Sequence, residues 1–199
     1  MTEPSYQECG KKIPDHYENP IDILLLELNG YMNPWYRRMG FTPNLLTTVS
    51  LVVTVVGLGI YRYGFTVLGA ILYFVGYYFD CADGNFARRY NLVTTFGDYY
   101  DHISDVFKYL VFMWVLLASP ISNQYKLGVI AVLLVFLTGM LVHFGCQERL
   151  YNREGESGTL SFFKTWCQDT EWINQTRYLG CGTFQLTITI ILLLLPTFR

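Results

Sequence analysis

The sequence predicts an all-α integral membrane protein: a bundle of about five transmembrane helices, preceded by an N-terminal amphipathic helix in the membrane interface. Only 15% of the 199 residues are charged and 52% are hydrophobic, whereas charged residues make up about 25% of an average soluble domain. The few charges leave long uncharged gaps along the chain. A net charge of −2 also argues against a nucleic-acid partner, which usually requires a basic face.

Five of these gaps are apolar and long enough for a spanning helix, which needs about 20 mostly apolar residues. The alternative is a soluble all-α protein, but soluble helices normally show a polar face. Gly180, Gly182 and Pro196 shorten the regular part of the fifth segment. The predicted spans are residues 42–62, 64–84, 101–119, 124–147 and 179–197.

The N-terminal segment, residues 1–41, is polar and contains one helical pattern. Asn19 followed by Pro20 is typical of a helix start, because Asn caps the first turn and Pro suits its first position. Such a helix fits the membrane interface, and it also fits an ordinary packed helix. The hydrophobic residues that follow at helical spacing are Ile21, Leu24, Leu25 and Leu28.

The remaining chain divides into three parts. Residues 42–150 form the predicted transmembrane core, residues 151–178 an amphipathic loop, and residues 179–199 the last transmembrane helix. The loop is too charged to cross a bilayer, and its aromatic residues favour a surface helix resting on lipid. A short re-entrant element in this loop is the alternative, which would make a sixth helix.

The distribution of Lys and Arg predicts the orientation. Because cytoplasmic loops carry an excess of basic residues, we expect the N-terminus and the connection between the second and third spans to face the cytoplasm. The basic residues that support this orientation are Lys11, Lys12, Arg37, Arg38, Arg88, Arg89, Arg149, Arg153 and Lys164.

The cysteines show neither a CxxC pair nor the spacing of a disulfide framework. We therefore expect reduced thiols at all five. They are Cys9, Cys81, Cys146, Cys167 and Cys181.

Four aspartates lie where the second predicted span ends and the third begins: Asp80, Asp83, Asp101 and Asp105. Acids within a bilayer are functional candidates, because a carboxylate at its centre costs about 2.5–3.5 kcal/mol. The spacings i, i+3 and i, i+4 place each pair on one helix face. A short connection folds the two helices back together, so we expect the four carboxylates to converge and to require a cation.

Their chemistry predicts a site for a diphosphate. Oxygen ligands suit Mg²⁺, Mn²⁺ or Ca²⁺ rather than Zn²⁺, and carboxylates that hold two ions about 3.5–4 Å apart are typical of displacement at phosphorus. Gly84 and Gly97 flank the acids and let a ligand approach the backbone closely. Arg88 adds a planar cation suited to phosphate.

These residues resemble the motif of the CDP-alcohol phosphotransferase family, D-x2-D-G-x2-A-R-x8-G-x3-D-x3-D. Here the motif reads Asp80-Cys-Ala-Asp83-Gly84-Asn-Phe-Ala87-Arg88, followed at the same spacings by Gly97, Asp101 and Asp105. Every fixed position matches. Upstream, the segment from Pro43 and Asn44 to Thr47 resembles the P-N-x-x-T segment that opens the family's first span.

The resemblance implies a phospholipid-biosynthetic enzyme that transfers a substituted phosphate from a CDP-linked donor to an acceptor hydroxyl and releases CMP. It implies two Mg²⁺ or Mn²⁺ ions, with Asp105 also acting as general base. The implied metal ligands are Asp80, Asp83, Asp101 and Asp105. The implied CDP-binding residues are Asp83, Gly84, Ala87, Arg88 and Gly97. Further candidate site residues are Asn44, Thr47, His102 and Lys108.

Several alternatives stay open at this stage. Asp101-His102 resembles the branch that joins CDP-choline or CDP-ethanolamine to diacylglycerol, whereas the compact length resembles the branch that joins CDP-diacylglycerol to a small alcohol. A membrane cation or proton pathway would explain the acids but not the fixed glycines and arginine. Members of the family often have six or more spans and five are predicted here, a difference that would fit an inactive family scaffold. Many relatives form homodimers, which the sequence neither supports nor excludes.

Overall fold

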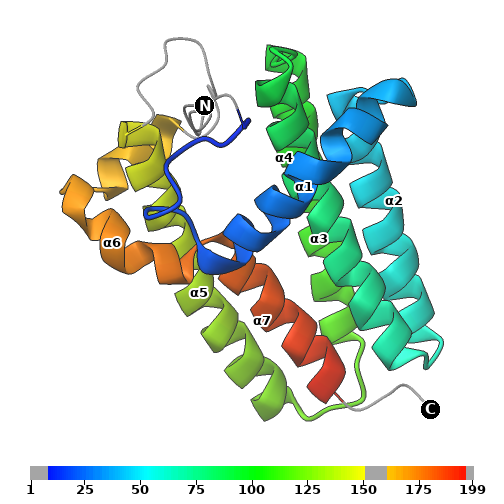
Figure 1. The fold of residues 1–199 in the computed structure, drawn as a ribbon. Coiled ribbons are helices and arrows are strands. Elements are labelled where there is room, and N and C mark those ends of the chain that lie inside the picture. Colours follow the sequence, from blue (N-terminus) through cyan, green and yellow to red (C-terminus); the bar gives the residue numbers. More distant parts are fainter. Residues whose placement is uncertain (1–8, 151–160, 196–199) are drawn as a thin grey trace.

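The computed structural model describes residues 9–150 and 161–195, and these residues form helices without a strand (Figure 1). A helix occupies each of the five predicted spans. The elements are α1 (Pro20–Arg38), α2 (Pro43–Arg62), α3 (Thr66–Arg89), α4 (Thr95–Leu117), α5 (Asn123–Leu150), η1 (Ser161–Trp166), η2 (Thr170–Trp172), α6 (Ile173–Thr176), η3 (Arg177–Leu179) and α7 (Cys181–Leu194).

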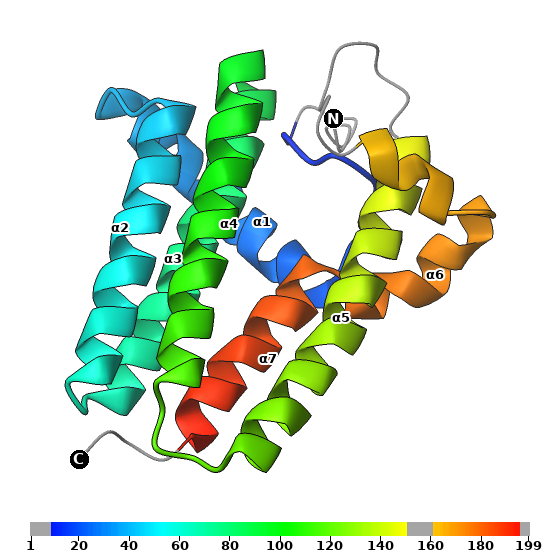
Figure 2. The same cartoon turned by 180° about the vertical axis from the view of Figure 1, so that it is seen from behind.

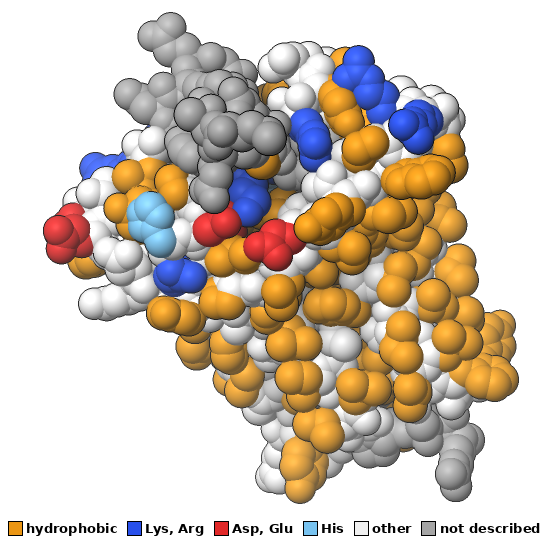
Figure 3. All heavy atoms as spheres, in the orientation of Figure 1, with side chains coloured by type: hydrophobic (Ala, Val, Ile, Leu, Met, Phe, Trp, Pro, Cys, Tyr) orange, Lys and Arg blue, Asp and Glu red, His pale blue; other side chains and the backbone are white. Residues whose placement is uncertain are grey.

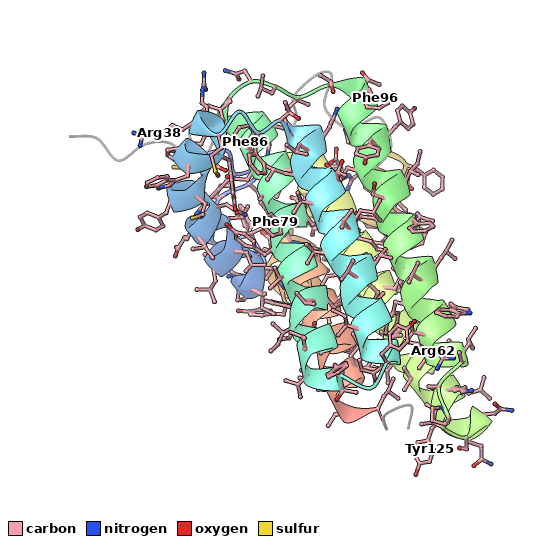
Figure 4. All side chains as sticks on the ribbon, turned by 90° about the vertical axis from the view of Figure 1, so that its right-hand side faces the viewer. Arg38, Arg62, Phe79, Phe86, Phe96 and Tyr125 are labelled. Atoms are coloured by element: carbon pink, nitrogen blue, oxygen red, sulfur yellow. A yellow bond between two sulfur atoms is a disulfide. The ribbon has the colours of Figure 1, made fainter. Side chains whose placement is uncertain are left out.

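The long helices form a bundle with two distinct ends. Figures 1 and 2 show α2, α3 and α4 side by side, with α5 and α7 completing the bundle and α1 crossing it at a slant. The main hydrophobic core lies among α2, α3, α4, α5 and α7. Figure 4 places Arg38 and Phe96 near one end and Arg62 and Tyr125 near the other.

The bundle has the surface of an integral membrane protein. Pro43–Arg62, Asn123–Leu150 and Thr170–Leu194 are long and apolar enough to cross a membrane. The third of these segments includes the short turns that precede α7. Figure 3 shows hydrophobic side chains over the lower part of one face, with charged side chains confined to its upper half. The predicted class of all-α membrane protein is therefore confirmed.

Helices α3 and α4 are also long enough to span, with 24 and 23 residues. They are less apolar than the three segments named above, because Asp80 and Asp83 lie in α3 and Asp101 and Asp105 lie in α4. The count of five spans stays a prediction.

Helix α1 buries several polar side chains and exposes several large hydrophobic ones. The Asn19 side chain accepts a hydrogen bond from the Ile21 amide, so the predicted cap is present. Polar residues of α1 are buried, among them Asp22 and Asn29. The large hydrophobic residues that α1 exposes are Leu24, Leu28, Tyr31 and Trp35. This arrangement fits a helix whose outer face rests in lipid.

Helices α2 and α3 approach each other closely through glycines. A methyl group added at Gly57 would lie 2.7 Å from Leu72 Cβ, and one added at Gly76 would lie 3.1 Å from the Ser50 carbonyl oxygen. Small residues at a helix interface allow such contact in membrane proteins. The close packing sets the register that brings Thr47 and Ser50 of α2 beside the acids of α3.

A tight connection returns the chain from α3 to α4. Asn91 has a positive φ of 54°, a conformation that Asn adopts more readily than most residues. The Thr94 side chain then accepts a hydrogen bond from the Gly97 amide at 3.0 Å and caps α4. The end of α3 and the start of α4 therefore lie beside each other.

One expectation about the cysteines is wrong. Cys146 of α5 and Cys167, just after η1, form a disulfide across a sequence separation of 21 residues. Sequence spacing did not reveal this pair, because the contact depends on the chain folding back onto the end of α5. The described part of the predicted surface loop forms the short helical turns η1, η2, α6 and η3 rather than one helix, and residues 151–160 lie outside the described chain.

Candidate active site

A cavity of about 250 Å³ lies where α3 ends and α4 begins. Every fixed position of the motif lines it, although these positions are spread over two helices. They are Asp80, Asp83, Gly84, Ala87, Arg88, Gly97, Asp101 and Asp105. Asn44, Thr47 and His102 line the same cavity, so the structure brings most of the further candidates to it as well.

Three of the four acids form a compact cluster. Asp80, Asp101 and Asp105 each offer an oxygen, and these oxygens lie within 4.8 Å of one another. Asp83 lines the cavity outside this cluster, and its Oδ2 accepts a hydrogen bond from Thr47 Oγ1 at 2.5 Å. The convergence that the spacing predicts is present for three carboxylates, with the fourth held beside them by α2.

Lys108 supplies a cation to the cluster from within the protein. Its ammonium pairs with Asp105 Oδ1 at 2.7 Å and with Asp80 Oδ1, and it donates a hydrogen bond to Ser50 Oγ at 3.0 Å. Ser50 Oγ in turn donates to Asp80 Oδ1 at 3.3 Å. Lys108 therefore touches the acids directly, although it lines a neighbouring cavity rather than this one.

The oxygen cluster fits a divalent cation. Asp101 Oδ1 is buried and accepts no hydrogen bond from the described residues. An unpartnered buried carboxylate oxygen is costly, and an ion bound beside it would supply the missing partner. The donor set consists of carboxylate oxygens, which Mg²⁺ and Mn²⁺ prefer.

Small residues keep part of the cavity open beside the acids. A methyl group at Gly84 would lie 3.1 Å from Arg88 Nη1, and one at Gly97 would lie 3.2 Å from Asn44 Oδ1. Glycine at these positions leaves room for a ligand against the helix backbone. His102 also lines the cavity, and its Nδ1 lies 2.6 Å from the Asp98 carbonyl oxygen.

A second cavity of about 250 Å³ is lined mainly by α4, α5 and α7, with Thr54 of α2 and Tyr73 and Tyr77 of α3. It shares Asp105, Phe144 and Cys181 with the first cavity. Its further lining is mostly apolar and includes Leu110, Leu137, Met140 and Phe184. An apolar space therefore adjoins the polar site at the carboxylate of Asp105.

Sequence reasoning missed several residues that shape the site. Ser50 lies on the same face of α2 as Thr47, three positions later, and this spacing was the available signal. Lys12 lines the cavity from the N-terminal segment, where the sequence suggested only an orienting charge. Phe144 and Cys181 come from α5 and α7, and no pattern linked them to the motif.

A comparison with protein-family models agrees with this geometry. The model for CDP-alcohol phosphatidyltransferase matches residues 41–198. The chain is therefore a member of the CDP-alcohol phosphatidyltransferase family, whose enzymes transfer a substituted phosphate group from a CDP-alcohol. A search of curated proteins found no match.

Proposed function

We propose that this protein transfers a substituted phosphate from a CDP-linked donor to an acceptor hydroxyl. The reaction takes place in the first cavity, which the four aspartates line and which is here named the aspartate cavity. The observation that carries the proposal is the convergence of all fixed motif positions on one cavity with three clustered carboxylates. The acids gather at one end of the bundle. That position favours a reaction at the membrane surface over a cation pathway, whose acids would be spread across the membrane depth.

The donor occupies the first cavity, with its diphosphate near Arg88 and the carboxylate cluster. Asp80, Asp101 and Asp105 would hold the divalent ions, with Asp83 completing the set. Two bound Mg²⁺ or Mn²⁺ ions would neutralise the diphosphate and stabilise the departing CMP. Gly84, Ala87 and Gly97 leave space for the nucleotide, and the Arg88 guanidinium offers planar donors to phosphate oxygens.

Asp105 acts as the general base. Its carboxylate takes the proton of the acceptor hydroxyl while the acceptor oxygen forms a bond to the β-phosphorus. The bond between that phosphorus and the oxygen bridging to CMP breaks, and CMP leaves. Lys108 fixes the orientation of this carboxylate through the contact of 2.7 Å.

The second cavity accommodates the hydrocarbon part of the lipid substrate. Because it meets the first cavity at Asp105, a hydroxyl on a lipid held there would lie beside the general base. This position favours a diacylglycerol-type acceptor, with a soluble CDP-alcohol as the donor.

We further propose a multi-pass arrangement with the N-terminus and the cavity on the cytoplasmic side. Basic residues at this end of the bundle support it, because positive charge is retained in the cytoplasm. A water-soluble CDP-linked donor would then reach the cavity from the cytoplasm, and the lipid would arrive from within the bilayer.

A substrate panel tests the proposal. The purified protein, with Mn²⁺ or Mg²⁺, would be offered CDP-choline or CDP-ethanolamine with diacylglycerol, and separately CDP-diacylglycerol with inositol, serine or glycerol phosphate. We expect release of CMP with a soluble donor and diacylglycerol. Release only with CDP-diacylglycerol would reassign the acceptor, and no release with any pair would contradict the proposed function.

A further inference from the structure

We propose that residues 9–12, outside the family match, complete the nucleotide-diphosphate pocket: the Gly10 carbonyl orients Arg88, and Lys12 supplies a second cation to the diphosphate. The identity of this ligand rests on the proposed function. The family match begins at residue 41, so the motif itself assigns no role to this segment, here named the N-terminal strap. Figures 1 and 2 show the start of the described chain between the upper ends of α4 and α5.

The strap is fixed to the end of α3 by specific contacts. Asn85 Nδ2 donates to the Cys9 carbonyl oxygen at 3.1 Å, and Asn85 Oδ1 accepts from Asn33 Nδ2 of α1 at 2.6 Å. Gly10 has a φ of +76°, and a methyl group there would approach the Asn85 carbonyl oxygen and lie 3.0 Å from Arg89 Cβ. The backbone can therefore lie this close to α3 only because residue 10 is glycine.

The same contact orients the arginine of the motif. Arg88 Nε donates a hydrogen bond of 2.9 Å to the Gly10 carbonyl oxygen. Arg88 Nη1 and Nη2 lie over Gly84, at 3.1 and 3.4 Å from the position of an added methyl group. The hydrogen bond from Nε fixes the orientation of the planar guanidinium, whose two terminal amino groups lie side by side and can bind two phosphate oxygens at once.

The other end of the strap is fixed to α5. The Lys12 ammonium pairs with Glu148, whose side chain is only 3% exposed. Ile13 is buried in a small cluster with Cys146, Cys167 and Ile173. The strap thus extends from α3 to α5, and Lys12 lines the same cavity as Arg88 and the aspartates.

Lys12 and Arg88 give this cavity two cations of different geometry. Arg88 presents a rigid fork and Lys12 a compact ammonium with three donors. A CDP-linked donor carries a diphosphate that the carboxylate cluster repels when no metal ion is present. Glu148 holds the ammonium at the cavity wall, and a diphosphate that enters gains a charge-assisted contact from it.

The test measures binding of CDP and of cytidine by the full-length protein in detergent with Mg²⁺, by equilibrium dialysis. Lys12→Met is compared with Lys11→Met, because Lys11 is the neighbouring lysine and pairs with Asp15 at 2.6 Å without lining the cavity. We expect Lys12→Met to weaken CDP binding by at least about tenfold, the loss of one charged hydrogen bond. Cytidine binding and CDP binding by Lys11→Met should stay unchanged.

Additional variants separate the electrostatic role from a folding defect. Lys12→Met leaves Glu148 buried without its cation, so Lys12→Met combined with Glu148→Gln restores a neutral environment and should still bind CDP weakly. Lys12→Arg should recover part of the affinity. Gly10→Ala should displace the strap and weaken CDP binding as well, with the thermal unfolding temperature measured alongside.

The outcomes distinguish this inference from the proposed function. If the unsubstituted protein binds CDP and Lys12→Met binds it equally well, the inference is overturned while the proposed function stands. An equal loss of CDP and cytidine binding would also overturn it, because a damaged fold rather than a missing diphosphate contact would be responsible. Absence of CDP binding by the unsubstituted protein would overturn both.

Discussion

The carboxylates of Asp80 and Asp105 share one ammonium, that of Lys108. This lysine lies one turn after Asp105, so its carbon stem and its charge both face the acids. The ammonium balances part of the negative charge of the cluster. A divalent ion entering the cluster would meet this positive charge at close range and be repelled by it.

Replacement of Lys108 by methionine should therefore have opposite effects with and without metal. Removal of the ammonium should lower the unfolding temperature in a metal chelator, because the acids lose their internal cation. The same change should tighten binding of Mn²⁺, measured by electron paramagnetic resonance. Lys126→Met is the control, since Lys126 donates to the Leu117 carbonyl oxygen away from the cavity. Weaker Mn²⁺ binding by Lys108→Met would contradict this interpretation.

The sequence predicted this residue-scale chemistry best where it lay within one helix or across one short turn. The spacing of Asp80, Asp101 and Asp105 was enough to predict their cluster, because helix periodicity and a short connection determine it. Ser50 and Lys12 escaped prediction because their contacts depend on how separate helices pack. No local spacing encodes such contacts.

At the scale of the elements, the register between α2 and α3 depends on glycines at their interface. Gly76 of α3 lies against Thr54 and the Ser50 carbonyl of α2. A larger side chain there would push the helices apart. Ser50 and Thr47 would then lose their positions beside Asp80 and Asp83.

Gly76→Leu should destabilise the protein by about 1–3 kcal/mol or more, the usual effect of overpacking, and should reduce CMP release. Gly59→Leu on α2 is the matched control, because a Cβ added at Gly59 points into open space, with no heavy atom of another element within 4 Å. Thermal unfolding in detergent and CMP release would be measured on both. Equal stability and activity of the two variants would show that the α2–α3 contact is not needed.

Helix α1 brings a buried acid against α3 and α7. Asp22 accepts hydrogen bonds from the Tyr77 hydroxyl and, at 3.1 Å, from the Gly182 amide. Burial and the nearby charge of Glu18 raise the pKa of Asp22 from 3.8 to about 7, against the opposing effect of these hydrogen bonds. Between these two values the folded chain binds more protons than the unfolded chain, so stability falls as pH rises.

Asp22→Asn should reduce this pH dependence, because the amide resembles the protonated acid and stays neutral. We expect the unfolding temperature of the variant to fall less than that of the unsubstituted protein between pH about 4 and about 7. If the unfolding temperatures of the two proteins change with pH in parallel, Asp22 does not titrate in this range.

The inward polar face of α1 was not predictable from its leucines alone. The sequence showed helical spacing for Leu24 and Leu28, and the structure exposes both. A hydrophobic stripe can face a protein core or lipid, and periodicity does not distinguish them. The buried partners of Asp22 lie on α3 and α7, far along the chain.

At the scale of the whole molecule, two observations favour opposite orientations. Basic residues at the cavity end favour the cytoplasm, whereas the disulfide between Cys146 and Cys167 at this end is typical of oxidising compartments. The proposed cytoplasmic orientation therefore needs a direct test. The fold class, an all-α membrane protein, could be predicted from the composition of the chain. The orientation in the membrane and the disulfide could not be predicted from it.

Epitope tags inserted at the N-terminus and in the connection between α4 and α5 provide this test. In sealed membrane vesicles with the cytoplasmic side outward, we expect protease to remove the N-terminal tag and to leave the loop tag intact. The reverse pattern would place the cavity on the opposite side and would explain the disulfide.

The most direct test of the central claim is CMP release by Asp105→Asn. Glu27→Gln on the exposed side of α1 is the control, since it makes the same acid-to-amide change outside the cavity. We predict that Asp105→Asn lowers metal-dependent CMP release by about 10²–10⁴-fold, the usual contribution of a general base, while Glu27→Gln keeps full activity. Undiminished release by Asp105→Asn would contradict phosphate transfer at the aspartate cavity.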